Sequence, residues 1–265
     1  MNVLDFAIKK KHGDKICMVT CYDYISARIL SETELDGLLV GDSAAMMIYG
    51  YENTLPMSLE MMCHHTAAVR RGTKRQFIIS DLPFLSFRKS FNFNISAAQK
   101  LMQAGAHALK MEGANGNLKL IRHLTESGVP VMGHLGLTPQ YLHALGGYKL
   151  QGITSKSATL IMNEAHQLQE AGCFAIVLEC IPTSLAQSIT QKLAIPTIGI
   201  GAGADTDGQV LVFHDVLGLN KDFAPKFVKA FIKGDKQIKK GVTSYIDAVK
   251  KGLFPDHEHT YHDQN

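Results

Sequence analysis

The chain has 265 residues, of which 46% are hydrophobic and 19% are charged, and its formal net charge is +3. A hydrophobic fraction this large fills one substantial core, which excludes an intrinsically disordered chain. No stretch approaches the roughly 18 consecutive apolar residues of a membrane span, so we expect no membrane partner.

The basic excess is confined to one segment near the C-terminus. Residues 221–251 contain nine lysines against three aspartates, and the polar tail 252–265 is acidic. Because charge balances over residues 1–220, the chain lacks the signature of a nucleic-acid-binding protein. The Lys-rich segment 221–251 has apolar residues at helical spacing, which predicts helices with one solvated face or a contact between subunits.

Cysteine usage and the N-terminal residues indicate the compartment. The five cysteines are odd in number and include no CxxC pair, which predicts buried thiols in a reducing compartment. Residues 1–15 are charged and lack the apolar core of a signal peptide. We therefore expect a cytoplasmic protein.

Eight short apolar runs bounded by Gly, Pro, Asp or Ser recur along the chain. Their continuous apolar character is typical of parallel strands buried on both faces. The runs are Ile16–Thr20, Gly37–Val40, Phe77–Ser80, Ala108–Met111, Val129–Met132, Ala175–Leu178, Thr197–Ile200 and Val210–Phe213.

Helical patterns fill the intervals between these runs. Capping-box spacing at Ser96–Gln99 and Ser184–Gln187 predicts two helix starts, and residues 157–171 carry an apolar stripe that includes Leu160. Eight strands alternating with helices predict an α/β fold, a single-domain (β/α)₈ TIM barrel over residues 1–265. A doubly wound sheet with an extra subdomain is the alternative.

Acidic residues follow three consecutive strands of this barrel, at the end where such folds carry their active sites. Asp42, Asp81 and Glu112 would lie on strands about 4.8 Å apart, where three carboxylates repel one another unless a cation lies between them. Oxygen ligands of this kind suit Mg²⁺. The alternative is that each acid caps a loop or pairs with a neighbouring lysine.

Further polar residues occupy the same strand ends. Lys110 shares a strand face with Glu112, so it either stabilises an anionic substrate oxygen or, with a lowered pKa, forms a Schiff base. Charged acidic neighbours favour the first role. Glu179, across the barrel, is a candidate general base or a solvated loop residue. His134 and Ser43 either contact substrate or stabilise their own loops.

Several sequence blocks resemble the ketopantoate hydroxymethyltransferase family. They run in order through about nine tenths of the chain, and the blocks at 133–140 and 198–209 are long enough to be specific. The blocks are Gly41–Ser43, Thr54–Pro56, His64–Gly72, Asp81–Phe84, Lys110–Gly113, Gly133–Gln140, Gly146–Lys149, Leu178–Cys180, Ile198–Gly203 and Thr206–Gln209.

The resemblance implies a (β/α)₈ barrel that transfers a one-carbon unit from 5,10-methylenetetrahydrofolate to 3-methyl-2-oxobutanoate, giving 2-dehydropantoate for pantothenate and coenzyme A biosynthesis. In the family, residues matching Asp42, Asp81 and Glu112 bind Mg²⁺. The family residues that match Ser43, Lys110 and both aspartates bind the keto acid. The family glutamate that matches Glu179 accepts a proton. The family also implies a homo-oligomer, a decamer.

Two other classes compete with this interpretation. The isocitrate lyase and phosphoenolpyruvate mutase group also uses Mg²⁺ and keto acids, but it carries a catalytic Cys that residues 112–117 and 133–140 lack. A barrel that binds a keto acid without catalysis, or serves as an assembly subunit, is disfavoured by the complete set of strand-end polar residues.

Overall fold

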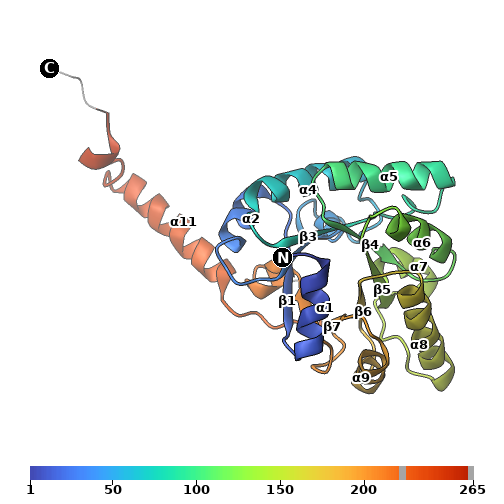
Figure 1. Ribbon diagram of the computed structural model, residues 1–265. Helices are drawn as coiled ribbons and strands as arrows, with labels where there is room; N and C mark the ends of the chain where they lie inside the picture. The colour runs from blue at the N-terminus through green and yellow to red at the C-terminus, as the bar shows by residue number, and fades with distance from the viewer. Residues whose placement is uncertain (221–224, 262–265) are drawn as a thin grey trace. The chain divides into compact units, whose positions relative to one another are not determined.

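The computed structural model describes residues 1–220 and 225–261, and it divides the chain into two units, Met1–Val212 and Phe213–Asn265. The first unit contains a closed barrel of eight parallel strands in chain order, with β8 pairing β1 (Figure 1). The strands are β1 (Ile16–Thr20), β2 (Gly37–Val40), β3 (Phe77–Asp81), β4 (Ala108–Glu112), β5 (Val131–Gly136), β6 (Ala175–Glu179), β7 (Thr197–Ile200) and β8 (Gly208–Leu211). The predicted (β/α)₈ barrel is confirmed.

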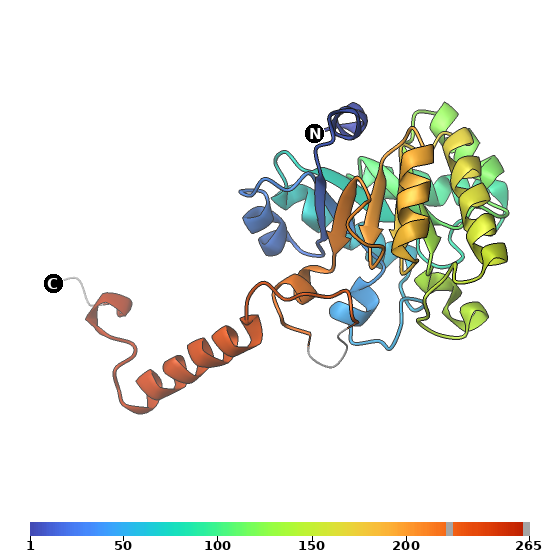
Figure 2. The ribbon, with the colours of Figure 1, turned by 90° about the horizontal axis from the view of Figure 1, so that it is seen from below.

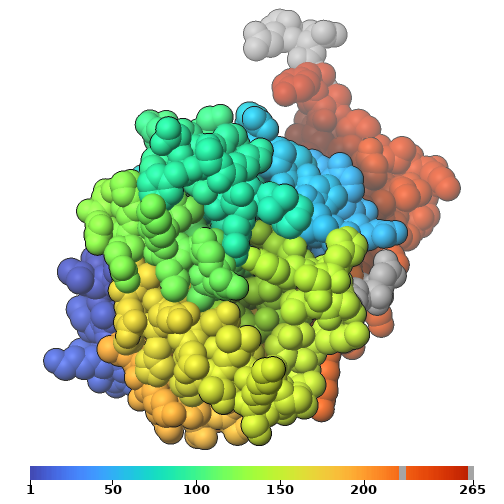
Figure 3. All heavy atoms as spheres, turned by 90° about the vertical axis from the view of Figure 1, so that its right-hand side faces the viewer, coloured from blue at the N-terminus to red at the C-terminus, as the bar shows by residue number. Residues whose placement is uncertain are grey.

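Helices alternate with these strands, except between β7 and β8, which are joined by residues 201–207 without a helix. In the first unit they are α1 (Val3–His12), α2 (Tyr24–Leu30), α3 (Ala44–Met47), α4 (Leu59–Gly72), α5 (Phe91–Gln103), α6 (Leu118–Glu126), the 3₁₀ helix η1 (Pro139–Tyr141), α7 (Leu142–Leu145), α8 (Ser155–Glu170) and α9 (Thr183–Lys192). Helices from the middle of the chain, coloured green to yellow, cover the side of the barrel seen in Figure 3. Short side chains on α5 and α8, such as Ala97, Ala98 and Ala165, are buried and let these helices approach the strands.

The second unit contains α10 (Phe213–Val216), α11 (Gly234–Lys250) and the 3₁₀ helix η2 (His257–His259). The Lys-rich segment was predicted to be helical, but residues 225–233 are irregular, with a turn at 226–227 and a bend at 231–232, and the helix α11 begins only at Gly234. Residues 221–224 of that segment, and residues 262–265 of the polar tail, lie outside the described residues. No helix in the described ranges is both long and apolar enough to cross a membrane.

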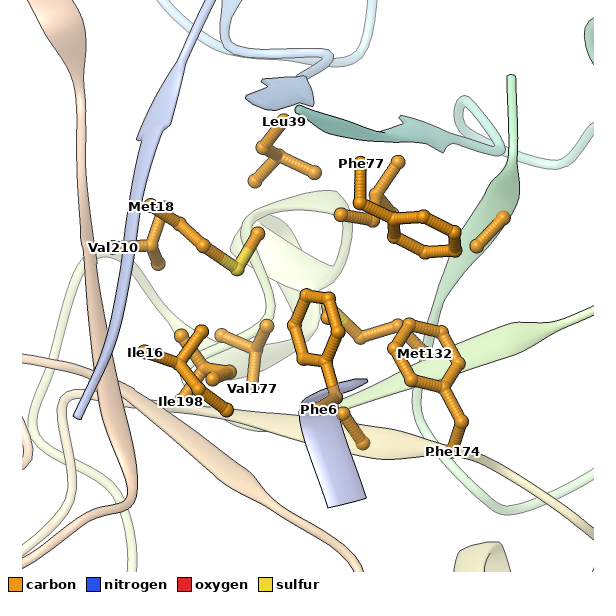
Figure 4. Packing of buried hydrophobic residues seen from close by; sticks show 13 residues of the cluster. Phe6, Ile16, Met18, Leu39, Phe77, Met132, Phe174, Val177, Ile198 and Val210 are labelled. Carbon is orange, nitrogen blue, oxygen red and sulfur yellow. The ribbon is translucent and has the colours of Figure 1, made fainter. Parts of the chain in front are cut away.

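One end of the barrel is closed by the N-terminal helix. Asn2 caps α1 by accepting hydrogen bonds from the amides of Leu4 and Asp5, and this places Phe6 against the strands. The Phe6 ring meets the rings of Phe77 and Phe174 edge-on, with centroids 5.5 and 5.4 Å away (Figure 4). The opposite end carries the segments that follow β2 and β5 (Figure 2). This end of the barrel, opposite α1, therefore carries the loops that hold the predicted polar site residues.

Several local predictions differ from the structure. Ser96 lies inside α5, which Ser90 caps, and α9 begins at Thr183 directly after Pro182. Leu160 is 57% exposed, outside the buried stripe of α8. All five cysteines are free, but only Cys21 and Cys173 are buried, while Cys17 is exposed. Local capping patterns recur inside helices, which is why they misplaced these two starts.

A histidine near the closed end gives the fold a defined pH response. Nδ1 of His107 accepts a hydrogen bond from the Ile78 amide, and burial, Arg70 and the N-terminal ammonium lower the pKa of His107. His107 is therefore harder to protonate in the folded state than in the unfolded state. Its contribution to the free energy of unfolding is fully present above the unfolded pKa of about 6.5 and is lost as the pH falls below that value. We expect unchanged protein to lose more stability than His107→Gln between about pH 7.5 and about pH 5.5 in urea unfolding. Equal losses in the two proteins would contradict this.

Candidate active site

The ladder between neighbouring strands brings the predicted residues to one end of the barrel. Asp81 of β3 lies opposite Lys110 of β4, and Glu112 of β4 lies opposite His134 of β5. Residues two apart on a strand share a face, so Lys110 and Glu112 face the same way. Asp81, Lys110, Glu112 and His134 are all buried. Register alone thus gathers four of the predicted residues.

Lys110 lies between two of the carboxylates. Its Nζ is 2.8 Å from Oδ1 of Asp81 and 3.9 Å from Oε1 of Glu112. Burial lowers the pKa of Lys110, but the negative charges of Asp81, Glu112 and Asp42 outweigh burial and raise it above its usual range. Lys110 is therefore charged, which favours the electrostatic role over the Schiff base.

Asp42 reaches the cluster from the loop after β2. Its backbone amide donates to Oδ2 of Asp81 at 3.0 Å, and its own Oδ2 accepts from Nε2 of Gln140 at 2.8 Å. Burial, followed by the charges of Asp81 and Glu112, raises the pKa of Asp42 well above its usual value. The carboxylates therefore repel one another in the absence of a further cation.

His134 connects the carboxylate cluster to Glu179. Nδ1 of His134 is 3.3 Å from Oε1 of Glu112, and Nε2 is 3.1 Å from Oε2 of Glu179. Burial and the Lys110 charge lower the pKa of His134, but the two carboxylates outweigh them and bring it to about 9. The imidazole is therefore protonated at neutral pH. Glu179, expected to stand apart from the other acids, is instead paired with this histidine.

The charges at this end bear on whether a metal ion fits. Four carboxylates, those of Asp42, Asp81, Glu112 and Glu179, face two cationic side chains, so the cluster carries excess negative charge. Oε1 of Glu112 accepts no well-aligned hydrogen bond. Oxygen donors with uncompensated charge suit a hard divalent ion. In residues 1–220 and 225–261, however, no three His, Cys, Asp or Glu side chains form a ready coordination group, since Lys110 stands between two of them.

Two buried residues that were not among the predicted site residues complete the cluster. Tyr22, two residues after the end of β1, makes a hydroxyl contact of 2.8 Å with Oγ of Ser43, and burial raises its pKa above the usual range. Gln140 in η1 contacts both Asp42 and Glu112. The position of Tyr22 after a strand was an available signal. Gln140 had none beyond its place in the block Gly133–Gln140.

Close backbone packing positions Glu179. Gly136 has a φ of +93°, and a Cβ atom there would collide with the carbonyl oxygen of Glu179, so the close approach at the end of the β5–β6 pair requires glycine. The Leu137 amide donates to that same oxygen at 2.8 Å. Cys180, the next residue, has a φ of +47°, which directs the chain away after β6.

The Gly199–Gly203 segment is explained by packing. A Cβ at Gly199 would lie 2.7 Å from Oγ1 of Thr206, and one at Gly203 would lie 2.5 Å from Cγ2 of Thr183. Glycines at these positions let β7 and the following turn fit against their neighbours, which favours a structural role for this segment.

Comparisons with known proteins agree with this picture. Residues 1–257 match the family model described as ketopantoate hydroxymethyltransferase. The chain is 54% identical to 3-methyl-2-oxobutanoate hydroxymethyltransferase of Bdellovibrio bacteriovorus over 259 residues, covering 98% of both chains. It is 50% identical to the protein of that name in Francisella tularensis subsp. novicida over 260 residues, again covering 98% of both.

Among solved structures, phosphoenolpyruvate phosphomutase from Streptomyces platensis subsp. rosaceus superposes with a TM-score of 0.63. The match covers 95% of this chain and 88% of that one, at 9% sequence identity. At this low sequence identity, the similarity shows only that the two proteins share the barrel fold.

Proposed function

The chain belongs to the ketopantoate hydroxymethyltransferase family and is a hydroxymethyltransferase, and on that premise we propose its full reaction. It transfers a hydroxymethyl group from 5,10-methylenetetrahydrofolate to 3-methyl-2-oxobutanoate, giving 2-dehydropantoate, with Mg²⁺ required. This reaction serves pantothenate and coenzyme A biosynthesis in the cytoplasm. The name shared by the relatives supports the acceptor substrate.

The proposal rests on one observation: the charged side chain of Lys110 is buried among carboxylates at this end of the barrel. The proposed reaction converts the keto acid to an enolate, and a buried positive charge stabilises the negative charge that develops on its oxygen. We propose that Asp42, Asp81 and Glu112 hold Mg²⁺, which supplies Lewis-acid stabilisation of negative charge on the keto oxygen when bound. The ammonium of Lys110 lies beside Asp81 and provides a second positive charge for the same oxygen.

The remaining residues bind the keto acid and move the proton. We propose that Asp42, Ser43, Asp81, Lys110 and His134 contact the substrate. The positive charge of His134, which lies between Glu112 and Glu179, attracts an anionic substrate group, and Tyr22 fixes the Ser43 hydroxyl. Glu179, the more accessible partner of the His134 pair, accepts the proton that C3 of the acceptor loses.

Glu179→Gln tests this role. The amide keeps the shape of the side chain but cannot accept the proton, so we expect turnover to fall about 10²- to 10⁴-fold while the affinity for Mg²⁺ is retained. Exchange of the C3 proton of 3-methyl-2-oxobutanoate for deuterium, followed by NMR without folate, measures the step directly. Glu164→Gln is the control, because Glu164 is a half-buried carboxyl on α8. Full exchange in the Glu179 variant would assign the proton to another base.

The proposed reaction itself is tested with purified protein, 3-methyl-2-oxobutanoate, methylenetetrahydrofolate and Mg²⁺. We expect 2-dehydropantoate to form, and to form only when all three are present. Folded protein that produces none above the enzyme-free control would overturn the proposal.

We also propose that the protein is a homo-oligomer, a decamer, and that residues 213–265 are an assembly segment of the barrel domain. The apolar residues of α11 follow helical spacing on one stripe, and all are exposed: Ile238, Val242, Tyr245, Ile246 and Val249. An exposed apolar stripe of this kind is typical of a protein interface. Light scattering of the purified protein measures the number of copies, and a monomer at assay concentrations would overturn this part.

A further inference from the structure

The sequence block Gly133–Gln140 ends in a residue that the proposed reaction does not use. Gln140 lies in η1, the 3₁₀ helix between β5 and α7, and it is only 4% exposed although its side chain is polar. Buried amides are normally retained because they make specific hydrogen bonds. The partners of Gln140 therefore indicate what it does.

The backbone of Gln140 holds Glu112. The first amides of a helix have no partner inside the helix, and Pro139 at the start of η1 has no N–H to offer. The first available donor is thus the Gln140 amide, which donates to Oε2 of Glu112 at 3.0 Å.

The side chain of Gln140 holds Asp42. Its Nε2 donates to Oδ2 of Asp42 at 2.8 Å and to the carbonyl oxygen of Leu82 at 2.9 Å. Both partners are acceptors, so the orientation of the amide is determined by its surroundings. Its Oε1 has no hydrogen-bond partner among the described residues and remains able to accept one from a bound ligand.

We propose that Gln140 is a positioning residue that fixes Asp42 and Glu112 in the geometry needed to bind a divalent cation. This inference rests on the metal part of the proposed function. A neutral amide suits the task, because it orients a carboxylate without the positive charge that would compete with the cation. One residue thereby ties the loop after β2, strand β4 and the turn after β5 together.

The test is the affinity of metal-free protein for Mn²⁺, measured by calorimetry or electron paramagnetic resonance without substrate. Gln140→Met has similar volume but no donor on its side chain, and we expect its Kd for Mn²⁺ to rise about 10- to 100-fold. Gln140→Asn keeps the amide on a shorter side chain, and we expect a smaller rise. Because these variants retain the backbone bond to Glu112, they test the side-chain contacts with Asp42 and Leu82 alone.

Gln76→Met is the matched control. Gln76 is also buried, its Nε2 donates to the backbone oxygens of Leu30 and Thr33, and it lies just before β3, away from the strand ends that carry the site. We expect it to lower the thermal midpoint while leaving the Kd for Mn²⁺ unchanged.

The outcomes separate the two proposals. A Kd for Gln140→Met within twofold of the unchanged protein, or an equal weakening in Gln76→Met, would overturn the positioning role alone. If the unchanged protein binds no Mn²⁺, the metal part of the proposed function fails and the positioning role fails with it.

Discussion

Asp81→Ala is expected to reduce Mg²⁺-dependent turnover at least about a thousandfold. Oδ1 of Asp81 pairs with Lys110, and Oδ2 accepts from the Asp42 amide, so one carboxylate orients both neighbours in addition to its proposed role as a ligand. Its removal takes away a ligand and leaves the loop after β2 without its anchor. Steady-state assays across a range of Mg²⁺ concentrations measure the loss, which excess Mg²⁺ should not restore.

Asp36→Ala is the control for this experiment. Asp36 is also a mostly buried aspartate with a lysine partner, since Lys9 lies 2.9 Å away, but it precedes β2 at the other end of the strand. We expect Asp36→Ala to lower stability and leave kcat near that of the unchanged protein. A comparable loss of turnover in both variants would show that the effect of Asp81 is structural.

Lys110→Met is expected to lower both stability and turnover. The substitution leaves Asp81 and Glu112 buried without their shared cation, and breaking a buried ion pair costs about 3–5 kcal/mol. For a chain of this size, that corresponds to a fall of roughly 6–20 °C in the thermal midpoint. We expect Mg²⁺ to recover part of the midpoint, because a divalent ion replaces the missing charge, while turnover stays low.

Lys10→Met separates these two effects. Lys10 pairs with Asp207 at 2.7 Å, and its side chain is 16% exposed, so this pair is also partly buried. We expect a smaller fall in the midpoint, a rise with Mg²⁺ no larger than that of the unchanged protein, and normal turnover. If Mg²⁺ raises the midpoint of Lys110→Met no more than that of Lys10→Met, the cation does not replace the charge of Lys110.

The barrel could be predicted because each strand is a continuous apolar run, and only its ends were misplaced. Asp81, Glu112 and Glu179 are the last residues of β3, β4 and β6, whereas the prediction ended those strands one residue earlier. Ladder hydrogen bonds are made by the backbone, so a strand continues through a charged side chain. β5 likewise starts two residues later than predicted and extends through His134 to Gly136.

The eighth strand shows a different limit. It was predicted over Val210–Phe213, but β8 spans Gly208–Leu211 and Phe213 begins α10. A Cβ at Gly208 would collide with the Ile16 carbonyl oxygen, so glycine allows the strand to approach β1 and close the barrel. Judged by apolar character alone, Phe213 is a better strand residue than Gly208. Gly208 belongs to β8 because the neighbouring strand β1 lies too close for a side chain there.

The site residues were predictable where they belong to strands, and unpredictable where contacts cross loops. Parallel register explains why Lys110 faces Asp81. Register also brings His134 of β5 near Glu179 of β6, since Gly136 is the ladder partner of Glu179. The reach of Gln140 to Asp42 instead depends on the path of the turn after β5, which no residue pattern specifies.

The N-terminal helix has a consequence for how the chain folds during synthesis. Phe6 is made well before its aromatic partners Phe77 and Phe174, and β1 must also wait for β8. Contacts between such distant residues form slowly, because a long loop has to close before they stabilise anything. The first helix therefore leaves the ribosome with its core-facing side unsatisfied, and the barrel closes only after nearly the whole first unit has been translated.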